Sequence, residues 1–110
     1  MKMLKNLTPH EVKIITGEGT IVVKPSGVVA RCNEHEELAK DLAGIPVIRL
    51  VLGEVIDLPP EKKGVTLIVS HIVLQACPER NDLVKPGKPV RNAAGEIIGC
   101  LGLSVLGNNS

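Results

Sequence analysis

The sequence predicts a β-rich α+β domain, with about seven short strands in a mixed or antiparallel sheet and one or two short helices. Its 110 residues include 14 Val, 10 Ile and 13 Leu but no Phe, Tyr or Trp, and β-branched residues favour pleated strands. Apolar residues alternate with polar ones in several short segments that Gly and Pro separate. Helical segments do not alternate regularly with strands, which argues against a doubly wound sheet and leaves a small barrel as the alternative.

The first clear alternation, over residues 10–27, predicts a β-hairpin. Its strands carry apolar residues two positions apart, namely Val12 and Ile14, then Ile21 and Val23. Residues 16–19, Thr-Gly-Glu-Gly, supply the turn between the two strands. Residues 25–27, Pro-Ser-Gly, predict a second turn, which leads into a short strand over residues 28–31.

Residues 33–44 predict the main helix of the domain. Asn33 is a suitable N-cap, and Glu36 three residues later can complete a capping box. Acidic residues crowd the first turn, where the helix dipole stabilises them. Leu38 and Leu42 share one helical face at i,i+4 spacing, and a glycine ends the segment.

The apolar segment over residues 45–60 predicts one long strand, or two short strands that break near Gly53. The prolines at its end and the Glu-Lys-Lys-Gly that follows predict an exposed loop. Residues 65–70, Val-Thr-Leu-Ile-Val-Ser, form a continuous apolar run that is typical of a central strand. A short helix is expected over residues 71–77, with Ser70 as its N-cap and a proline as its stop.

The C-terminal part of the chain predicts a loop and a hairpin. Residues 79–89 are polar and predict the loop. Residues 90–105 predict the hairpin, with an Ala-Gly pair at its turn, and residues 107–110 predict a frayed tail. The whole chain, residues 1–110, is therefore predicted to form a single domain.

Charge and apolar content argue against several classes of protein. The net charge is +1 without a basic stripe, so we expect no duplex nucleic acid as a partner. The absence of aromatic rings also disfavours single-strand recognition by base stacking. No apolar run is long enough to span a membrane, and the first residues lack the apolar segment of a secretory signal. Three widely spaced cysteines give no disulfide framework, which favours the reducing cytoplasm.

Six segments stand out in order along the chain: NLTPHEV (6–12), PSGVVAR (25–31), GEVIDLPP (53–60), VSHIV (69–73), RNDLVKPG (80–87) and GEIIGCLGL (95–103). Together they resemble a family of small uncharacterised proteins from bacterial, prophage and phage genomes that open with Asn-Leu-Thr-Pro-His. Small phage proteins of this size include structural helpers and inhibitors of host defence, and some of those inhibitors sequester nucleotide immune signals. The resemblance implies one of these roles by analogy.

The polar residues of these segments lie at predicted strand ends and turns, where binding sites usually occur. They are Asn6, Thr8, His10, Ser26, Arg31, Ser70, Arg80 and Asp82. Arg31 and Arg80 are the candidate phosphate ligands, because a guanidinium group binds phosphate bidentately. The alternative for Arg80 is an ion pair with Asp82 or Glu79 that holds a loop. For His10, the alternative to a ligand contact is a role in stabilising its turn.

Neither a metal site nor a cofactor is expected. The possible metal ligands are His10, Cys32, His35, His71, Cys77 and Cys100. Cys32 and His35 are three residues apart, but structural zinc sites normally combine two such short-spaced pairs and the chain has no second one. His71 and Cys77 would fall on different faces of a helix. Cys77 and Cys100 are instead expected to be small buried residues.

Nucleophilic catalysis is a further hypothesis. Cys77 with His10 or His71, or Ser70 with a histidine, could form a dyad. The chain has no Gly-x-Ser-x-Gly motif, however, and the apolar segment around Cys77 would raise the pKa of its thiol rather than activate it. Ser70 is more simply a helix cap.

These observations favour a non-enzymatic binding protein of phage type that is cytoplasmic and homo-oligomeric. It would sequester a small anionic ligand, for which a cyclic or other signalling nucleotide is one candidate. Arg31 and Arg80 would hold phosphate in a shared hollow, and hydrogen bonds from other residues would orient the ligand, namely Asn6, Thr8, His10, Ser70 and Asp82. The oligomer is expected because the chain is small and rich in apolar strands with few guarded edges. The alternatives are a structural or interaction protein of phage or prophage, and a small hydrolase that uses His10 or Cys77.

Overall fold

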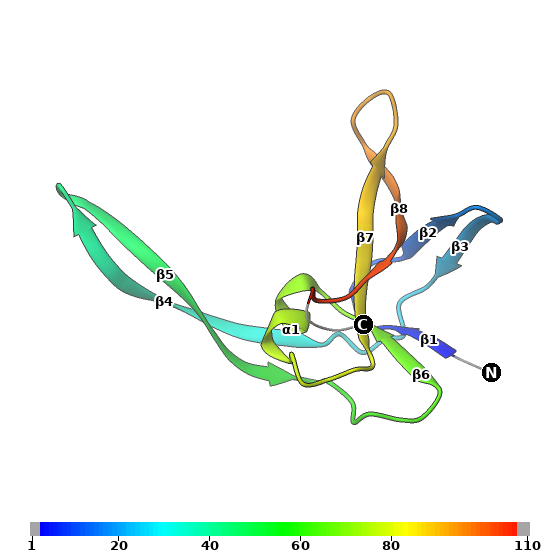
Figure 1. Cartoon of the computed structure of the whole chain (residues 1–110), viewed down its shortest axis with the longest axis horizontal. Helices are drawn as coiled ribbons and strands as arrows, with labels where there is room; N and C mark the ends of the chain where they lie inside the picture. The colour runs from blue at the N-terminus through cyan, green and yellow to red at the C-terminus, as the bar shows by residue number, and fades with distance from the viewer. Residues whose placement is uncertain (1–2, 108–110) are drawn as a thin grey trace.

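A curled, mixed β-sheet carries one long hairpin that projects away from it in the computed structural model, which describes residues 3–107 (Figure 1). The elements of this part of the chain are β1 (Met3–Asn6), β2 (Val12–Thr16), β3 (Gly19–Val23), β4 (Arg31–Leu42), β5 (Ile45–Ile56), β6 (Val65–Ile68), α1 (His71–Ala76), β7 (Leu83–Arg91) and β8 (Ile97–Ser104). The predicted β-rich class and mixed sheet are therefore confirmed. No helix in residues 3–107 has the length and apolar character needed to cross a membrane.

Six strands form the main sheet in the order β1-β6-β7-β8-β2-β3. The β1–β6, β6–β7 and β2–β8 pairs are parallel, and the β7–β8 and β2–β3 pairs are antiparallel. β6 lies inside the sheet, as its apolar sequence predicts. The sheet is curled so that its two edge strands, β1 and β3, approach each other. A bridge joins Asn6 at the end of β1 to Pro25 just after β3.

Two of the predicted local structures have the expected geometry. The β2–β3 hairpin pairs Val12 with Val23, and its turn is held by Thr16 Oγ1, which donates to the Gly19 carbonyl at 2.9 Å. Ser70 caps α1, because its hydroxyl accepts a hydrogen bond from the Val73 amide at 3.3 Å. The C-terminal hairpin, β7–β8, has the predicted Ala-Gly pair between its strands, but its first strand begins at Leu83 rather than at residue 90.

The core consists of two adjoining aliphatic clusters. The first packs α1 against the sheet and the base of the long hairpin, with Leu7, Leu67, Val69, Val73, Leu74 and Leu83 among its buried members. The second lies under β2 and β8 and contains Val12, Ile14, Ile68 and Cys100. Branched aliphatic side chains thus fill the interior of a protein that has no aromatic ring.

The helix predicted over residues 33–44 is wrong: residues 33–42 belong to β4, which pairs antiparallel with β5 from Arg31 to Leu42 with two register shifts. The i,i+4 leucines favour a helix locally, but the β-branched strand that follows offers a complete partner. Ala43 and Gly44 both have positive φ, at 51° and 86°, which gives the two-residue turn that sends the chain back along itself. Strand pairing therefore overrides the local helical pattern.

Three other expectations need correction or completion. The short strand predicted over residues 28–31 is absent from the structure, where the segment before Arg31 is irregular and Arg31 begins β4. The loop predicted over residues 79–89 is largely wrong, because β7 begins at Leu83. β1 was not predicted at all. Of the predicted tail, residues 108–110 lie outside the described residues.

The prolines of β7 explain why its sequence resembles a loop. Proline has no amide hydrogen for a strand ladder and is usually confined to edges and bulges. β6 pairs with β7 only at Leu83 and Val84, whereas Pro86 and Pro89 lie farther along, where β7 pairs with β8 on its other side. The strand therefore accommodates both prolines beyond the region that has a neighbour on each side.

Candidate functional site

Arg80 and Asp82 form a bidentate ion pair. Arg80 Nε donates to Asp82 Oδ1 at 2.8 Å, and Nη2 donates to Oδ2 at 2.7 Å and to the Pro59 carbonyl at 3.0 Å. The Asp82 side chain is 6% exposed and that of Arg80 18% exposed. The hydrogen bonds that Arg80 donates to the Asp82 carboxylate raise the pKa of the guanidinium above its ordinary value. This pair fastens the loop after β5 to the start of β7, which is the structural alternative considered for Arg80.

Asn6 is a buried polar residue that joins the two ends of the curled sheet. Its Nδ2 donates to the His10 carbonyl at 2.8 Å and to the Val23 carbonyl at 3.0 Å. Its Oδ1 accepts hydrogen bonds from the Thr8 amide at 2.9 Å and from the Thr8 hydroxyl at 2.6 Å. The Asn6 carbonyl accepts from the Ser26 amide at 2.9 Å. The buried amide thus has two donor and two acceptor contacts, and the Asn-Leu-Thr-Pro-His segment forms a turn around it.

The remaining predicted polar residues take separate positions. His10 contributes its carbonyl to the Asn6 turn, while its side chain is exposed. Ser70 is the cap of α1. Arg31 is exposed at the first position of β4, where the long hairpin leaves the body. The structure therefore brings together Asn6, Thr8 and the His10 backbone as one group, and Arg80 with Asp82 as another.

The expected hollow between Arg31 and Arg80 is not one of the three clefts described for residues 3–107. Neither arginine lines any of the three clefts described for this part of the chain. Two of them flank Asp82, and one of these contains Lys62 and Lys63 together with the carboxylates of Glu61 and Asp82, so acidic groups offset its positive charge. Because Arg80 is paired with Asp82 and lines none of these clefts, the structure gives no support to the expectation that the two guanidinium groups converge on one phosphate.

Cys77 lies in the first core cluster rather than in a reactive cleft. Burial raises the pKa of its thiol, and the nearby Glu79 carboxylate raises it further. The thiolate, which is the nucleophile, is therefore disfavoured at neutral pH. Among residues 3–107, no group of three or more His, Cys, Asp and Glu side chains is arranged to hold a metal ion.

The β4–β5 hairpin, hereafter the arm, is the feature that the sequence did not reveal. Each of its strands has twelve residues, so it is about 40 Å long. Its base packs on the core through Cys32 and Val55, and the remainder projects from the body (Figure 1). The register pairs Glu34, Glu36 and Leu38 with Leu52, Leu50 and Ile48, so that these six residues share one face.

This face of the arm is amphipathic and uncovered. Leu38 is 65% exposed and Leu50 62% exposed, and Ile48 and Leu52 are also exposed. We call the four residues Leu38, Ile48, Leu50 and Leu52 the apolar arm face. Glu34 and Glu36 lie beside it and form no ion pair within residues 3–107. On the opposite face, by contrast, the His35 ring lies 3.4 Å from the Glu37 carboxylate.

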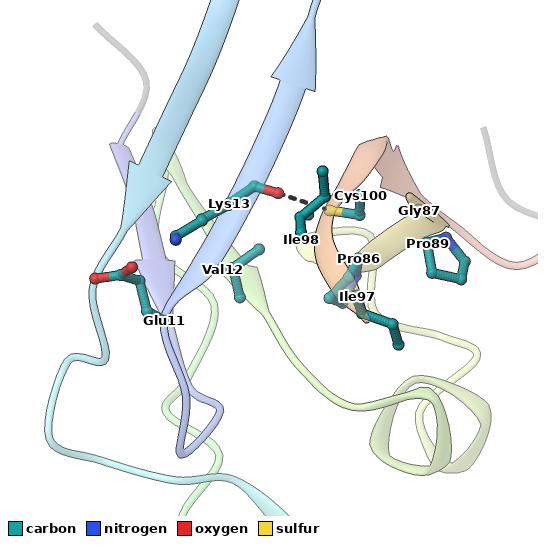
Figure 2. Close-up of a pocket in the computed structure, with 10 residues that line it drawn as sticks. Glu11, Val12, Lys13, Pro86, Gly87, Pro89, Ile97, Ile98 and Cys100 are labelled. Atoms are coloured by element: carbon teal, nitrogen blue, oxygen red, sulfur yellow. Dashed lines mark hydrogen bonds between the residues drawn. The ribbon is translucent and has the colours of Figure 1, made fainter. Parts of the chain in front are cut away.

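A cleft of about 520 Å³ lies between the start of β2 and the β7–β8 hairpin (Figure 2). Figure 2 shows Glu11, Val12 and Lys13 on one side and Ile97, Ile98 and Pro86 on the other. At its floor, the buried Cys100 thiol donates to the Lys13 carbonyl at 3.4 Å. We call this depression the β2–β8 cleft.

Two glycines give the β2–β8 cleft its shape. A Cβ atom at Gly99 would lie 3.0 Å from the Lys13 carbonyl oxygen, and a Cβ atom at Gly87 would overlap the carbonyl oxygen of Leu101. Both strands therefore approach their neighbours more closely than any other residue would allow. The alternating sequence predicted strands here, but the contact at Gly99 depends on the pairing of β8 with β2 and the contact at Gly87 depends on the pairing of β7 with β8.

Comparisons with protein-family models, with curated proteins and with solved structures find no match to this chain. The functional argument therefore rests on the geometry of the arm and the β2–β8 cleft.

Proposed function

We propose that this chain is a non-catalytic structural or interaction protein that works as a homo-oligomer, with the arm as the element that joins its subunits. The observation that supports this most strongly is the apolar arm face, which exposes large aliphatic side chains on a ribbon only two strands wide. A two-stranded hairpin is marginally stable in water unless something packs against it. Contiguous exposed apolar residues on a soluble chain mark an interaction surface.

The edges of the arm support the same proposal. β4 carries many charged residues, which guard an edge against unwanted pairing. β5 has only two charged residues among its twelve, Arg49 and Glu54. Its edge is therefore less protected against pairing, and its aliphatic side chains suit a specific contact. The resemblance to small phage and prophage proteins fits this role, since structural helpers occur among them.

Native mass spectrometry of the purified protein tests the proposal. A mass that is a multiple of 11.7 kDa is expected, and the same spectrum reports any small molecule that remains bound. A chain that stays at 11.7 kDa over the whole range of micromolar concentrations would contradict the proposed assembly.

A second candidate function is the capture of a small anionic ligand, and Arg31 is the residue that favours it. Arg31 is exposed where the arm meets the body, and within residues 3–107 it has no acidic partner at ion-pair distance. A guanidinium group in such a position can bind phosphate bidentately. Arg80 is not available for this role, because Asp82 occupies it.

Thermal-shift measurements with a panel of nucleotides test anion capture. A nucleotide that raises the Tm of the wild type but not of Arg31→Ala would support the second candidate. The matched control is Arg91→Ala, which removes a different exposed arginine on β7 and is expected to retain the shift. Equal shifts in all three proteins, or none, would remove this candidate without affecting the assembly proposal.

A further inference from the structure

We infer that the arm of one copy docks in the β2–β8 cleft of a second copy, so that the subunits associate head to tail. This inference rests on the proposed homo-oligomer and specifies where on the neighbouring subunit the arm binds. The occupant is a second copy of this chain, and the argument comes from complementary charge and complementary apolar surface.

The arm and the rest of the chain carry opposite charge. Residues 31–56 contain five acidic and three basic residues, whereas the rest of the sequence contains seven acidic and ten basic residues. On the arm, Glu34 and Glu36 lie beside the apolar arm face without an ionic partner in residues 3–107. Electrostatic attraction therefore favours contact between an arm and a body over contact between two arms.

The β2–β8 cleft has the chemistry that the arm requires. Its walls are largely aliphatic, with Ile97 and Ile98 exposed on β8. The charged residues that line the cleft are Lys13 and Glu11, and on β7 Lys85 and Lys88 immediately flank the lining residues, so lysines outnumber the one glutamate around the cleft. In the proposed contact, the apolar arm face packs against the isoleucines of the cleft. The glutamates beside the arm face then lie near the lysines around the cleft, so opposite charges meet at the rim of the interface.

The geometry indicates a head-to-tail contact rather than a symmetric one. The arm projects from the body in one direction and the β7–β8 hairpin in another (Figure 1). The residues that line the cleft lie on or beside β2, β7 and β8, and none of them belongs to the arm. Each subunit therefore has one arm to donate and one cleft to fill. Such a contact uses two different surfaces and repeats from subunit to subunit, which produces a closed ring or an open chain.

A mixing experiment tests this inference. The arm variant is Leu38→Ser with Leu50→Ser, and the cleft variant is Ile97→Ser with Ile98→Ser; all four residues are exposed, so the fold of each subunit should persist, which circular dichroism checks. Each variant alone is expected to be monomeric by light scattering after size exclusion. Mixed in equal amounts, they are expected to form a one-to-one heterodimer, because the mixture retains one intact arm and one intact cleft.

The outcomes separate failure of this inference from failure of the proposed function. If wild type assembles but the mixed variants stay monomeric, the arms bind somewhere other than the cleft and the inference is overturned, while the homo-oligomer stands. If wild type itself is monomeric, the proposed function fails as well. Leu101→Ser is the matched control, since Leu101 is exposed on the same strand but does not line the cleft, and it is expected to assemble like wild type.

A charge reversal provides a second measurement that does not depend on apolar residues. Glu34→Lys with Glu36→Lys, and Lys13→Glu with Lys88→Glu, are each expected to weaken self-association at least tenfold. The two charge-reversed proteins are expected to bind each other when mixed, and high salt should weaken that binding. Failure of the two proteins to associate, where both are folded and wild type assembles, would overturn the inference.

Discussion

Asp82 is a buried carboxylate whose burial is compensated by one arginine. Removal of that arginine leaves a charge in the interior without its partner, and such changes are strongly destabilising. Arg80→Ala is therefore expected to lower the free energy of unfolding by about 3 kcal/mol. Urea denaturation measures this loss, and replacing both residues, Arg80→Ala with Asp82→Ala, should cost less than the single change. A stable Arg80→Ala protein would contradict the structural role.

The Asn6 amide is a second residue that organises the fold from a buried position. Asn6→Ala removes two donated and two accepted hydrogen bonds and leaves the Val23 and His10 carbonyls without that donor. We expect a loss of about 4 kcal/mol, at the rate of about 1 kcal/mol for each of these four hydrogen bonds. His10→Ala is the control, because only the His10 backbone takes part, and it should change stability by less than about 0.5 kcal/mol. Equal losses for the two variants in urea denaturation would contradict this assignment.

The three cysteines differ in their surroundings and should differ in reactivity. Cys77 and Cys100 are buried, whereas Cys32 at the base of the arm is half-buried. Iodoacetamide near neutral pH is expected to label Cys32 first, and the other two only when the protein unfolds, as peptide mass spectrometry can show. Preferential labelling of Cys77 in the folded protein would contradict its core position and would revive the dyad hypothesis.

The raised pKa of Cys77 also gives stability a defined pH dependence. Because the folded thiol binds its proton more tightly than the unfolded one, its contribution is complete below the ordinary thiol pKa of about 8.5. That contribution is lost as the pH rises from there through the folded pKa. Cys77→Ala should remove this part of the alkaline loss of stability, relative to wild type.

At the residue scale, the sequence predicted several polar positions but could not assign their roles. Ser70 before a short apolar segment indicates a helix cap, and the structure has that cap. The Asn-Leu-Thr-Pro-His segment indicates a turn, but its role in closing the sheet depends on Val23 and Ser26, which are distant in the sequence. Arg80 could be predicted either to bind phosphate or to form an ion pair that holds a loop. The sequence does not show which, because the ion pair with Asp82 depends on how the loop folds.

Among the elements, the β7–β8 pair depends most directly on a single glycine. Gly87 stands against the backbone of Leu101 and Gly102, so the Cβ of an alanine would collide with atoms that cannot move independently of the strand. Gly87→Ala is expected to lower the free energy of unfolding by about 3 kcal/mol. Gly17→Ala, at a turn with open space around it, should change stability by less than about 0.5 kcal/mol. Similar unfolding midpoints for both variants would contradict the close approach of β7 and β8.

At the element scale, prediction succeeded where the local pattern and the long-range pairing agree. The β2–β3 hairpin and the capped helix α1 are both specified within short segments. The β4 strand is not: its cap and its leucine spacing favour a helix, and only the adjacent β-branched strand makes a ribbon more stable. β7 was missed for a related reason, because Pro86 and Pro89 resemble loop residues until the pairing with β8 is known.

The whole molecule is extended for a chain of its length. Its radius of gyration is 16.5 Å, whereas a compact domain of this size has about 13 Å. The arm accounts for the difference in shape, since it projects beyond the body (Figure 1). The exposed aliphatic surface of the arm supports the proposed homo-oligomer, which the apolar strand content of the sequence also predicts. The extended shape itself was not predicted, because residues 33–44 were expected to form a helix.

The mass of the protein in solution, measured by light scattering after size exclusion for wild type and for Leu38→Ser with Leu50→Ser, tests the role of the arm most directly. We predict a multiple of 11.7 kDa for the wild type and 11.7 kDa for the folded variant, because the variant lacks the aliphatic residues that join the subunits. The same mass for both proteins, whether monomeric or oligomeric, would contradict the account.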